Sequence, residues 1–297
     1  MWTDEDYEKW RLAGKAAGHA RDLGASLLRP GVSALEVVEK IEWEIYDSGA
    51  KPAFPATLSI NDVAAHYTPR PDDDLVIPYG AVVKVDVGAH VDGFVGDTAK
   101  TVEVGTRNWA ELIRASEHAL SNALDILKPQ LPLHMVGATI ERTITSYGYR
   151  PISNLTGHTV DRWTVHAGKS VPNVEDDNNH TLDIGEVVAV EPFSTNGLGR
   201  VENASGGNIF RVLGERPTDN EKADQLQTFL KQEFNGLPFA ERWCLRVDRK
   251  AGASLQKLWR LGLVMHYPAL RDGKGGIVAQ TEHTAIVQEN GVEVITE

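Results

Sequence analysis

The chain contains a single cysteine, Cys244, among its 297 residues. One thiol can form neither an intrachain disulfide nor a structural zinc site built on several thiolates. Basic residues are also scarce, because 30 Lys and Arg stand against 42 Asp and Glu, for a net charge of -12. Nucleic acids and anionic membranes attract clustered Lys and Arg. We therefore expect no direct contact with nucleic acid.

Long apolar runs and an export signal are missing as well. No apolar stretch approaches the ~20 residues that a membrane span requires. The chain opens on Met1-Trp2-Thr3-Asp4, which is acidic, whereas a secretory signal has a basic region followed by an apolar one. With 41% hydrophobic and 24% charged residues, the composition is that of a globular protein with a sizeable core. These features predict a cytoplasmic protein with no membrane partner.

Two aspartates in residues 84–100 are the first candidate site residues. The turn signal Asp92-Gly93 separates two β-prone runs, so the segment is typical of a hairpin. A two-residue loop there puts Asp86 and Asp97 on one face as diagonal neighbours. Like charges that close on an apolar hairpin repel and lose hydration, unless one takes a proton or a cation lies between them. Alone, the pair is equally compatible with a turn residue and an edge charge.

Three later segments each place one metal-ligand side chain in an apolar, β-prone run. His158 lies in such a run, Glu191 ends an apolar strand directly before a proline, and Glu282 lies in an alternating strand. Taken singly, each is compatible with a satisfied core histidine or a paired buried carboxylate. Together with the hairpin aspartates they form an oxygen-rich set, which suits Mn, Fe, Co or Zn. Two such ions would lie ~3.5–4 Å apart and acidify a shared water.

The spacing of helix signals predicts two related halves. Thr3 begins a capping box for a helix to about residue 28, and Ser33 begins another for a helix that ends near Gly49. Residues 129–151 repeat the pattern of residues 30–52. The matching positions are Pro30, Val37, Ile41, Glu42, Ile45, Gly49 and Pro52 with Pro129, Val136, Ile140, Glu141, Ile144, Gly148 and Pro151. The candidate ligands divide between the halves, so the site is expected where they meet.

Residues 196–272 break this pattern and lie between two candidate ligands. Four glycines near the start indicate loops, and Thr218 with Glu221 predicts a capped helix whose apolar face carries Leu226, Phe229, Leu230 and Phe234. A second helical stretch is expected near Leu255 and Leu258. We interpret residues 196–272 as a mostly helical insertion.

Five motifs together resemble a known family. They are KVDVGAHVDGFVGDTA at 84–99, NLTGHTVDRWTVHAG at 154–168, VVAVEPFSTNG at 187–197, AQTEHTAIV at 279–287 and FPATLSINDVAAHYTP at 54–69. In residues, order and near full-length extent, the chain resembles the type II methionine aminopeptidases in their short archaeal form. The resemblance implies the α/β (α+β) pita-bread fold, with a catalytic domain of residues 1–195 and 273–297 and the type II helical insertion at 196–272.

The same resemblance implies a dinuclear metal site with every ligand present. Asp86 would hold one ion, and His158 and Glu191 the other. Asp97 and Glu282 would bridge them. Thr281, beside Glu282, departs from the phenylalanine of many family members, so we expect the packing there to differ.

Further residues acquire roles through this match. His66 corresponds to the substrate-side histidine and His166 to the one that contacts the scissile carbonyl, so that His66, His166 and Glu191 are the implied catalytic residues. A methionine side-chain pocket is implied with the walls Phe54, His66, Val165, His166, Phe193, Pro238 and Tyr267.

By resemblance, the chain is a metal-dependent methionyl aminopeptidase that removes the initiator methionine from peptides and from nascent chains near the ribosome, when the second residue is small. A hydroxide bridging two divalent ions (Co, Mn, Fe or Zn) would attack the scissile carbonyl. His166 would stabilise the oxyanion, and Glu191 would carry the proton to the leaving amine. An apolar slot discriminates by only ~1–3 kcal/mol, so the selectivity would not be absolute. A monomer is expected.

Two alternatives stay open. Prolidases and Xaa-Pro aminopeptidases share the fold and the ligand types, although they usually carry a further domain before the first ligand. A non-catalytic peptide-binding homologue is the other alternative, against which the complete ligand set argues.

Overall fold

The structure is a computed structural model that describes residues 2–297. Its helices are α1 (Asp4–Leu27), α2 (Ala34–Asp47), α3 (Ala110–Ile126), α4 (Leu133–Ser146), α5 (Glu221–Phe234) and α6 (Ala251–Arg260), with the 3-10 helix η1 (Glu241–Arg246). Its strands are β1 (Lys51–Pro52), β2 (Thr57–Ile60), β3 (Val63–Ala65), β4 (Val82–Val91), β5 (Phe94–Glu103), β6 (Arg150–Pro151), β7 (Thr156–Val160), β8 (Ser170–Pro172), β9 (Val187–Val190), β10 (Phe193–Thr195), β11 (Val201–Val212), β12 (Phe239–Ala240), β13 (Val264–Asp272), β14 (Val278–Gln280), β15 (His283–Gln288) and β16 (Gly291–Val294).

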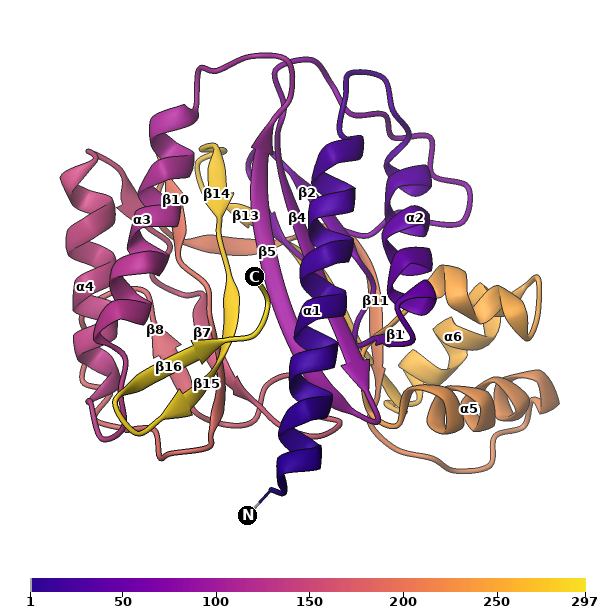
Figure 1. Cartoon of the computed structure of the whole chain (residues 1–297). Coiled ribbons are helices and arrows are strands. Elements are labelled where there is room, and N and C mark those ends of the chain that lie inside the picture. Colours follow the sequence, from indigo (N-terminus) through magenta and orange to yellow (C-terminus); the bar gives the residue numbers. More distant parts are fainter. Residues whose placement is uncertain (1) are drawn as a thin grey trace.

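In the first half, α1 packs on the β4–β5 hairpin, and α2 packs beside α1 and against β1 and β2 (Figure 1). Both helix starts are as predicted, because Thr3 forms a capping box with Asp6 and the Ser33 side chain accepts from the backbone N–H of Glu36. The contact is close: a Cβ atom on Gly96 of β5 would lie 2.6 Å from the Cα of Gly14 in α1. The aliphatic core beneath the helices holds the hairpin rigidly.

The second half repeats this plan with α3 and α4 on the opposite flank (Figure 1). Helices α2 and α4 both have 14 residues. Each is followed by a left-handed glycine, Gly49 with φ 79° and Gly148 with φ 80°, and then by a two-residue strand that ends at a buried proline. This agrees with the predicted repeat. The sheet of this half has the order β16-β15-β9-β7-β8.

Residues 196–272 contain the predicted helices and also two long strands that the sequence analysis did not identify. Strands β11 and β13 pair antiparallel, with a register shift between Ala204 and Ile209. Gly207 lies in this shift with φ 106°, and a Cβ atom there would lie 2.2 Å from the carbonyl oxygen of Tyr267. Helices α5 and α6 project at one edge of the molecule (Figure 1).

The predicted cap of α5 is wrong. The N-cap is Asn220, whose side chain accepts from the backbone N–H of Ala223. Thr218 cannot serve as the cap because its hydroxyl is engaged with the backbone of Asn220, in a turn before the helix.

Within residues 2–297, no helix combines the length and the apolar content that a membrane crossing requires.

Candidate metal centre

The β4–β5 hairpin confirms the predicted placement of its two aspartates. Asp86 lies opposite Ala99, and Asp97 lies opposite Gly88. The turn residues Asp92 and Gly93 have φ of 52° and 90°, as a two-residue loop with two left-handed positions requires. Asp97 is only 4% exposed. Both carboxylates therefore belong to one face of a rigid ribbon.

The other three candidate ligands reach this face from the second half. His158 lies within β7, opposite Ala189 of β9, and Glu191 directly follows β9. Glu282 lies between β14 and β15, where its backbone N–H donates to the carbonyl of Ala99 at 3.0 Å. This bridge to β5 brings Glu282 beside Asp97, so long-range pairing closes the site.

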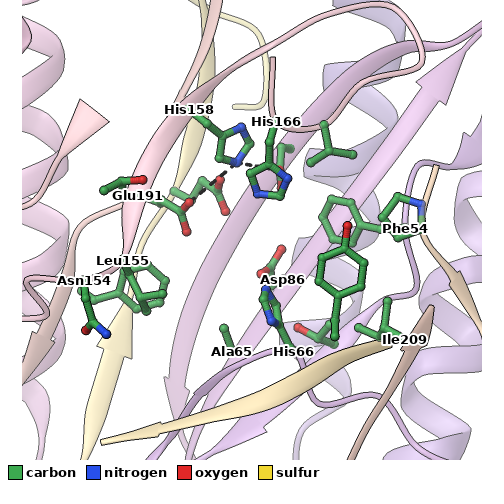
Figure 2. A pocket seen from close by; sticks show the side chains of 18 residues that line it. Phe54, Ala65, His66, Asp86, Asn154, Leu155, His158, His166, Glu191 and Ile209 are labelled. Carbon is green, nitrogen blue, oxygen red and sulfur yellow. Dashed lines mark ion pairs between the residues drawn. The ribbon is translucent and has the colours of Figure 1, made fainter. Parts of the chain in front are cut away.

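The donor atoms converge, and Figure 2 shows three of the donor side chains, those of Asp86, His158 and Glu191. Ligand atoms of Asp97, His158 and Glu282 lie within 4.8 Å of one another. The His158 Nε2 atom is 3.7 Å from Asp97 Oδ2 and also 3.7 Å from Glu191 Oε1. Asp86 lines the same cavity and faces this group. The structure thus brings all five predicted ligands to one site.

Burial sets the protonation of these groups. It raises the pKa of Asp86 to about 7 and, together with the neighbouring carboxylates, holds the pKa values of Asp97, Glu191 and Glu282 well above their ordinary range. Burial, with a smaller contribution from the charge of His166, lowers the pKa of His158 to about 3. His158 is therefore neutral near pH 7 and has a lone pair to offer.

Two carboxylate oxygens that lack hydrogen-bond partners within residues 2–297 are evidence that the site binds a cation. Asp86 Oδ1 and Asp97 Oδ1 are buried and have no hydrogen-bond partner among the described residues. Buried carboxylates without partners are costly, and a divalent ion satisfies them. A donor set of four carboxylates and one imidazole fits Mn, Fe, Co or Zn.

A cavity of about 220 Å³ opens beside these donors. All twelve predicted site residues line it, and six more residues complete it. The six are Thr57, Ala65, Asn154, Leu155, Thr156 and Ile209. In Figure 2, Phe54 and Ile209 lie on one side of the cavity and Asn154 and Leu155 on the other. Its walls come from the first half, from the second half and, through Pro238, Ile209 and Tyr267, from the insertion segment.

The two histidines outside the ligand set also face the cavity. The ring centroids of His166 and His158 lie 4.2 Å apart, and those of His66 and Tyr267 lie 5.7 Å apart. Burial, with the charge of His166 second, lowers the pKa of His66 to about 4. Burial, with the charge of Arg211 second, also lowers the pKa of His166. Neutral imidazoles can each donate one N–H to a substrate oxygen.

Sequence reasoning missed Gln280. Its Nε2 donates to Glu191 Oε2 at 3.3 Å and to Glu282 Oε2 at 3.4 Å, so one amide orients two candidate ligands. The sequence does contain a signal for this contact. Gln280 lies two residues before Glu282 in the AQTEHTAIV motif, and residues two apart in an extended segment face the same side. Thr281, between them, points elsewhere: its hydroxyl lies 2.9 Å from that of Ser116 on α3.

This fold and this buried donor set are those of a metal-dependent hydrolase, and the comparisons with known proteins agree. The sequence profile of metallopeptidase family M24 matches residues 8–289. The chain belongs to metallopeptidase family M24. It is 43% identical over 292 residues to a methionine aminopeptidase of Methanocaldococcus jannaschii, with 98% of this chain and 99% of that protein covered.

Solved structures share the fold. A methionine aminopeptidase from Thermotoga maritima has a TM-score of 0.73 and 25% identity, over 100% of this chain and 98% of that one. A prolidase from Pyrococcus furiosus has a TM-score of 0.63 and 19% identity, over 99% of this chain and 64% of that one. This likeness confirms the predicted pita-bread fold.

Proposed function

We propose that this chain is a methionine aminopeptidase that removes the N-terminal methionine from peptides and nascent proteins. The observation that carries the proposal is the cavity itself, in which five metal-ligand side chains adjoin apolar walls from three parts of the chain. The archaeal relative at 43% identity supports the same activity. We assign residues 1–195 and 273–297 to the catalytic domain and residues 196–272 to the insertion, and we expect a cytoplasmic monomer that meets nascent chains near the ribosome.

We assign the metal ligands as Asp86, Asp97, His158, Glu191 and Glu282, which together would hold two divalent ions of Co, Mn, Fe or Zn. Such ions supply Lewis acidity that polarises a carbonyl and lowers the pKa of water. The two aspartates come from one rigid hairpin. Of the other three donors, His158 lies within β7, Glu191 follows β9, and Glu282 lies between β14 and β15.

The protein side chains supply the remaining chemistry. Glu191 accepts a proton from the attacking water and donates it to the leaving amine, a transfer that its buried carboxylate beside His158 supports. His166, which is neutral, would donate an N–H to the scissile carbonyl, where negative charge develops. His66, also neutral, would contact the substrate from its own side of the cavity.

The apolar walls explain a preference for methionine. Phe54, Phe193 and Tyr267 offer aromatic surface to an unbranched thioether. Since packing of this kind separates near isosteres by only ~1–3 kcal/mol, we expect norleucine and leucine peptides to be cleaved more slowly, not to be refused.

A panel of three peptides tests the function. Met-Gly, Met-Leu and Gly-Pro peptides are incubated with the metal-free chain and with the Mn- or Co-loaded chain. We expect metal-dependent release of methionine, with a higher rate for Met-Gly than for Met-Leu. Cleavage of Gly-Pro without cleavage of Met-Gly would replace the proposal with a prolidase-like activity, and no cleavage of any peptide would indicate a binding protein.

A further inference from the structure

A buried ion pair joins helix α2 to the insertion segment. Glu42 of α2 is 6% exposed and Arg242 of η1 is 8% exposed, and the guanidinium Nη2 donates to Glu42 Oε1. The indole Nε1 of Trp243 donates to the other carboxylate oxygen at 2.9 Å. Burial raises the pKa of Glu42, and Arg242 opposes that rise. We name Glu42, Arg242 and Trp243 the Glu42 cluster.

Hydrogen bonds run from the Glu42 cluster to the backbone beside the cavity. The N–H of Ala56 donates to Glu42 Oε1 at 3.2 Å. Arg242 Nη1 donates to the hydroxyl of Thr68 at 2.7 Å, and that hydroxyl donates to the carbonyl of Ala56 at 2.8 Å. The cluster therefore fixes two separate backbone segments at once.

These two segments carry cavity residues. Phe54 lies two positions before Ala56, and His66 lies two positions before Thr68. His66 has a φ of 67°, which a residue other than glycine keeps only where the surrounding structure holds it. The segment after His66 is held by Thr68, through its bonds to Arg242 and Ala56.

On the insertion side, Arg242 shortly follows Pro238, which also lines the cavity. Strand β12 lies between them and pairs with β11, where Ile209, another cavity residue, is opposite Ala240. The Glu42 cluster thus joins cavity-lining segments of the first half to a cavity-lining segment of the insertion, and Phe54 packs against the apolar cluster that contains Leu237 and Phe239.

A buried ion pair is weak evidence for a stabilising role, since apolar residues of similar volume often serve stability as well or better. What this pair adds is a set of directional bonds that join the insertion segment to the backbone at Ala56 and to Thr68. We propose that Glu42 and Arg242 are positioning residues that hold these adjoining wall segments against each other. They thereby set the shape of the side-chain pocket and determine how well it separates methionine from other apolar N-terminal residues. This inference rests on the proposed function, because it concerns the selectivity of that site.

Two variants test the proposal. Arg242→Lys keeps the charge but loses the planar fork that reaches Glu42 and Thr68 together. Thr68→Val keeps the ion pair and the bond from the Ala56 N–H to Glu42. It removes the bond from Arg242 to Thr68 and the bond from Thr68 to the carbonyl of Ala56. For both, KM and kcat are measured on Met-, norleucine- and Leu-Gly peptides, with metal content determined in parallel. We expect the KM for the Met peptide to rise, by ~10-fold for Arg242→Lys, with kcat and metal content unchanged and a smaller preference for Met over Leu.

Glu141→Gln is the matched control, because Glu141 takes the place of Glu42 in the second half and its carboxylate accepts a single backbone N–H, that of Glu175, within residues 2–297. It should keep the wild-type KM and selectivity. In ¹⁵N-tryptophan spectra, the indole N–H signal of Trp243, assigned with Trp243→Phe, should shift in Arg242→Lys and not in Glu141→Gln.

The outcomes separate two failures. If the wild type releases no methionine, the proposed function is refuted, and this inference, which depends on it, is refuted as well. If the wild type is active, and Arg242→Lys and Thr68→Val are less stable yet keep the wild-type KM and Met-to-Leu ratio, the cluster is only structural and the positioning role is refuted.

Discussion

Helices α2 and α4 occupy equivalent places in the two halves, yet their matching glutamates have different surroundings. Glu42 of α2 is buried and contacts Arg242 and Trp243 of the insertion segment. Glu141 of α4 accepts one backbone N–H near the surface. The same helix, with the same glycine and proline after it, thus supports the pocket wall in the first half and a surface loop in the second.

The metal donors show a similar contrast. The first half supplies both of its carboxylates from one uninterrupted hairpin of ten-residue strands. The second half supplies His158 from a short strand, and Glu191 from the residue after another. The hairpin therefore holds its two donors in one continuous ribbon, whereas the short strand β7 leads directly into the connection to β8 that carries His166.

The largest effect is expected at the hairpin. Asp97→Asn removes a carboxylate oxygen that faces His158 and Glu282. Mutation of a residue that merely orients a metal ligand lowers activity by up to ~100-fold, so loss of a ligand itself should lower activity by more than that and reduce bound metal. Activity and metal analysis on the same sample measure both. Asp92→Asn, at the exposed turn of the same hairpin, is the control. Full activity and full metal content in Asp97→Asn would contradict the ligand assignment.

The two glutamates should differ in stability. Glu42→Gln leaves the guanidinium of Arg242 buried without its counter-charge, so we expect a loss of about 3 kcal/mol in the free energy of unfolding. Glu141→Gln should cost less than about 0.5 kcal/mol. Urea unfolding of the two variants beside the wild type measures the difference. Equal losses would remove the contrast between the halves.

A smaller effect is expected where the insertion segment begins and ends. The carboxylate of Asp272 is 1% exposed and accepts from the backbone N–H groups of Leu198, Gly199, Lys274 and Gly276. In Asp272→Asn, only one of the two terminal side-chain atoms can accept a hydrogen bond. The free energy of unfolding should therefore fall by about 2 kcal/mol at pH 7, which urea unfolding measures.

Asp272 also predicts a pH dependence. Burial raises its pKa, but the backbone N–H groups outweigh burial and leave the pKa below the ordinary 3.8. Its contribution to stability is therefore complete above about pH 4 and is lost as the pH falls through the lower folded-state pKa. The stability difference between Asp272→Asn and the wild type should shrink in that acidic range. A difference that stays constant down to pH 2 would refute this account.

The hairpin could be predicted from the sequence because its register follows from one local signal, the Asp92-Gly93 turn, and from alternation on either side of it. The five donors were recognisable because each is a polar residue in an apolar run. The register placed Asp86 and Asp97 together, and the repeat placed the site where the halves meet. The full set of five could be assigned to one metal site only from the resemblance, since their meeting depends on pairings such as Ala99 with Glu282.

The Glu42 cluster could not be predicted from the sequence. A glutamate on an amphipathic helix usually faces solvent, and its partner Arg242 is 200 residues away. Strand β11 was missed because its polar residues and its glycine pair interrupt any alternation. These features depend on tertiary contacts, which local patterns do not encode.

The most direct test follows methionine release from a Met-Gly peptide while Mn²⁺ is titrated into the metal-free chain, with bound metal measured at each step. We predict no activity without metal, and activity that rises as the ions bind and reaches its plateau when binding saturates at two ions per chain. Full activity in the metal-free chain, or saturable binding that brings no activity, would contradict the assignment of these five side chains to a metal site that removes methionine.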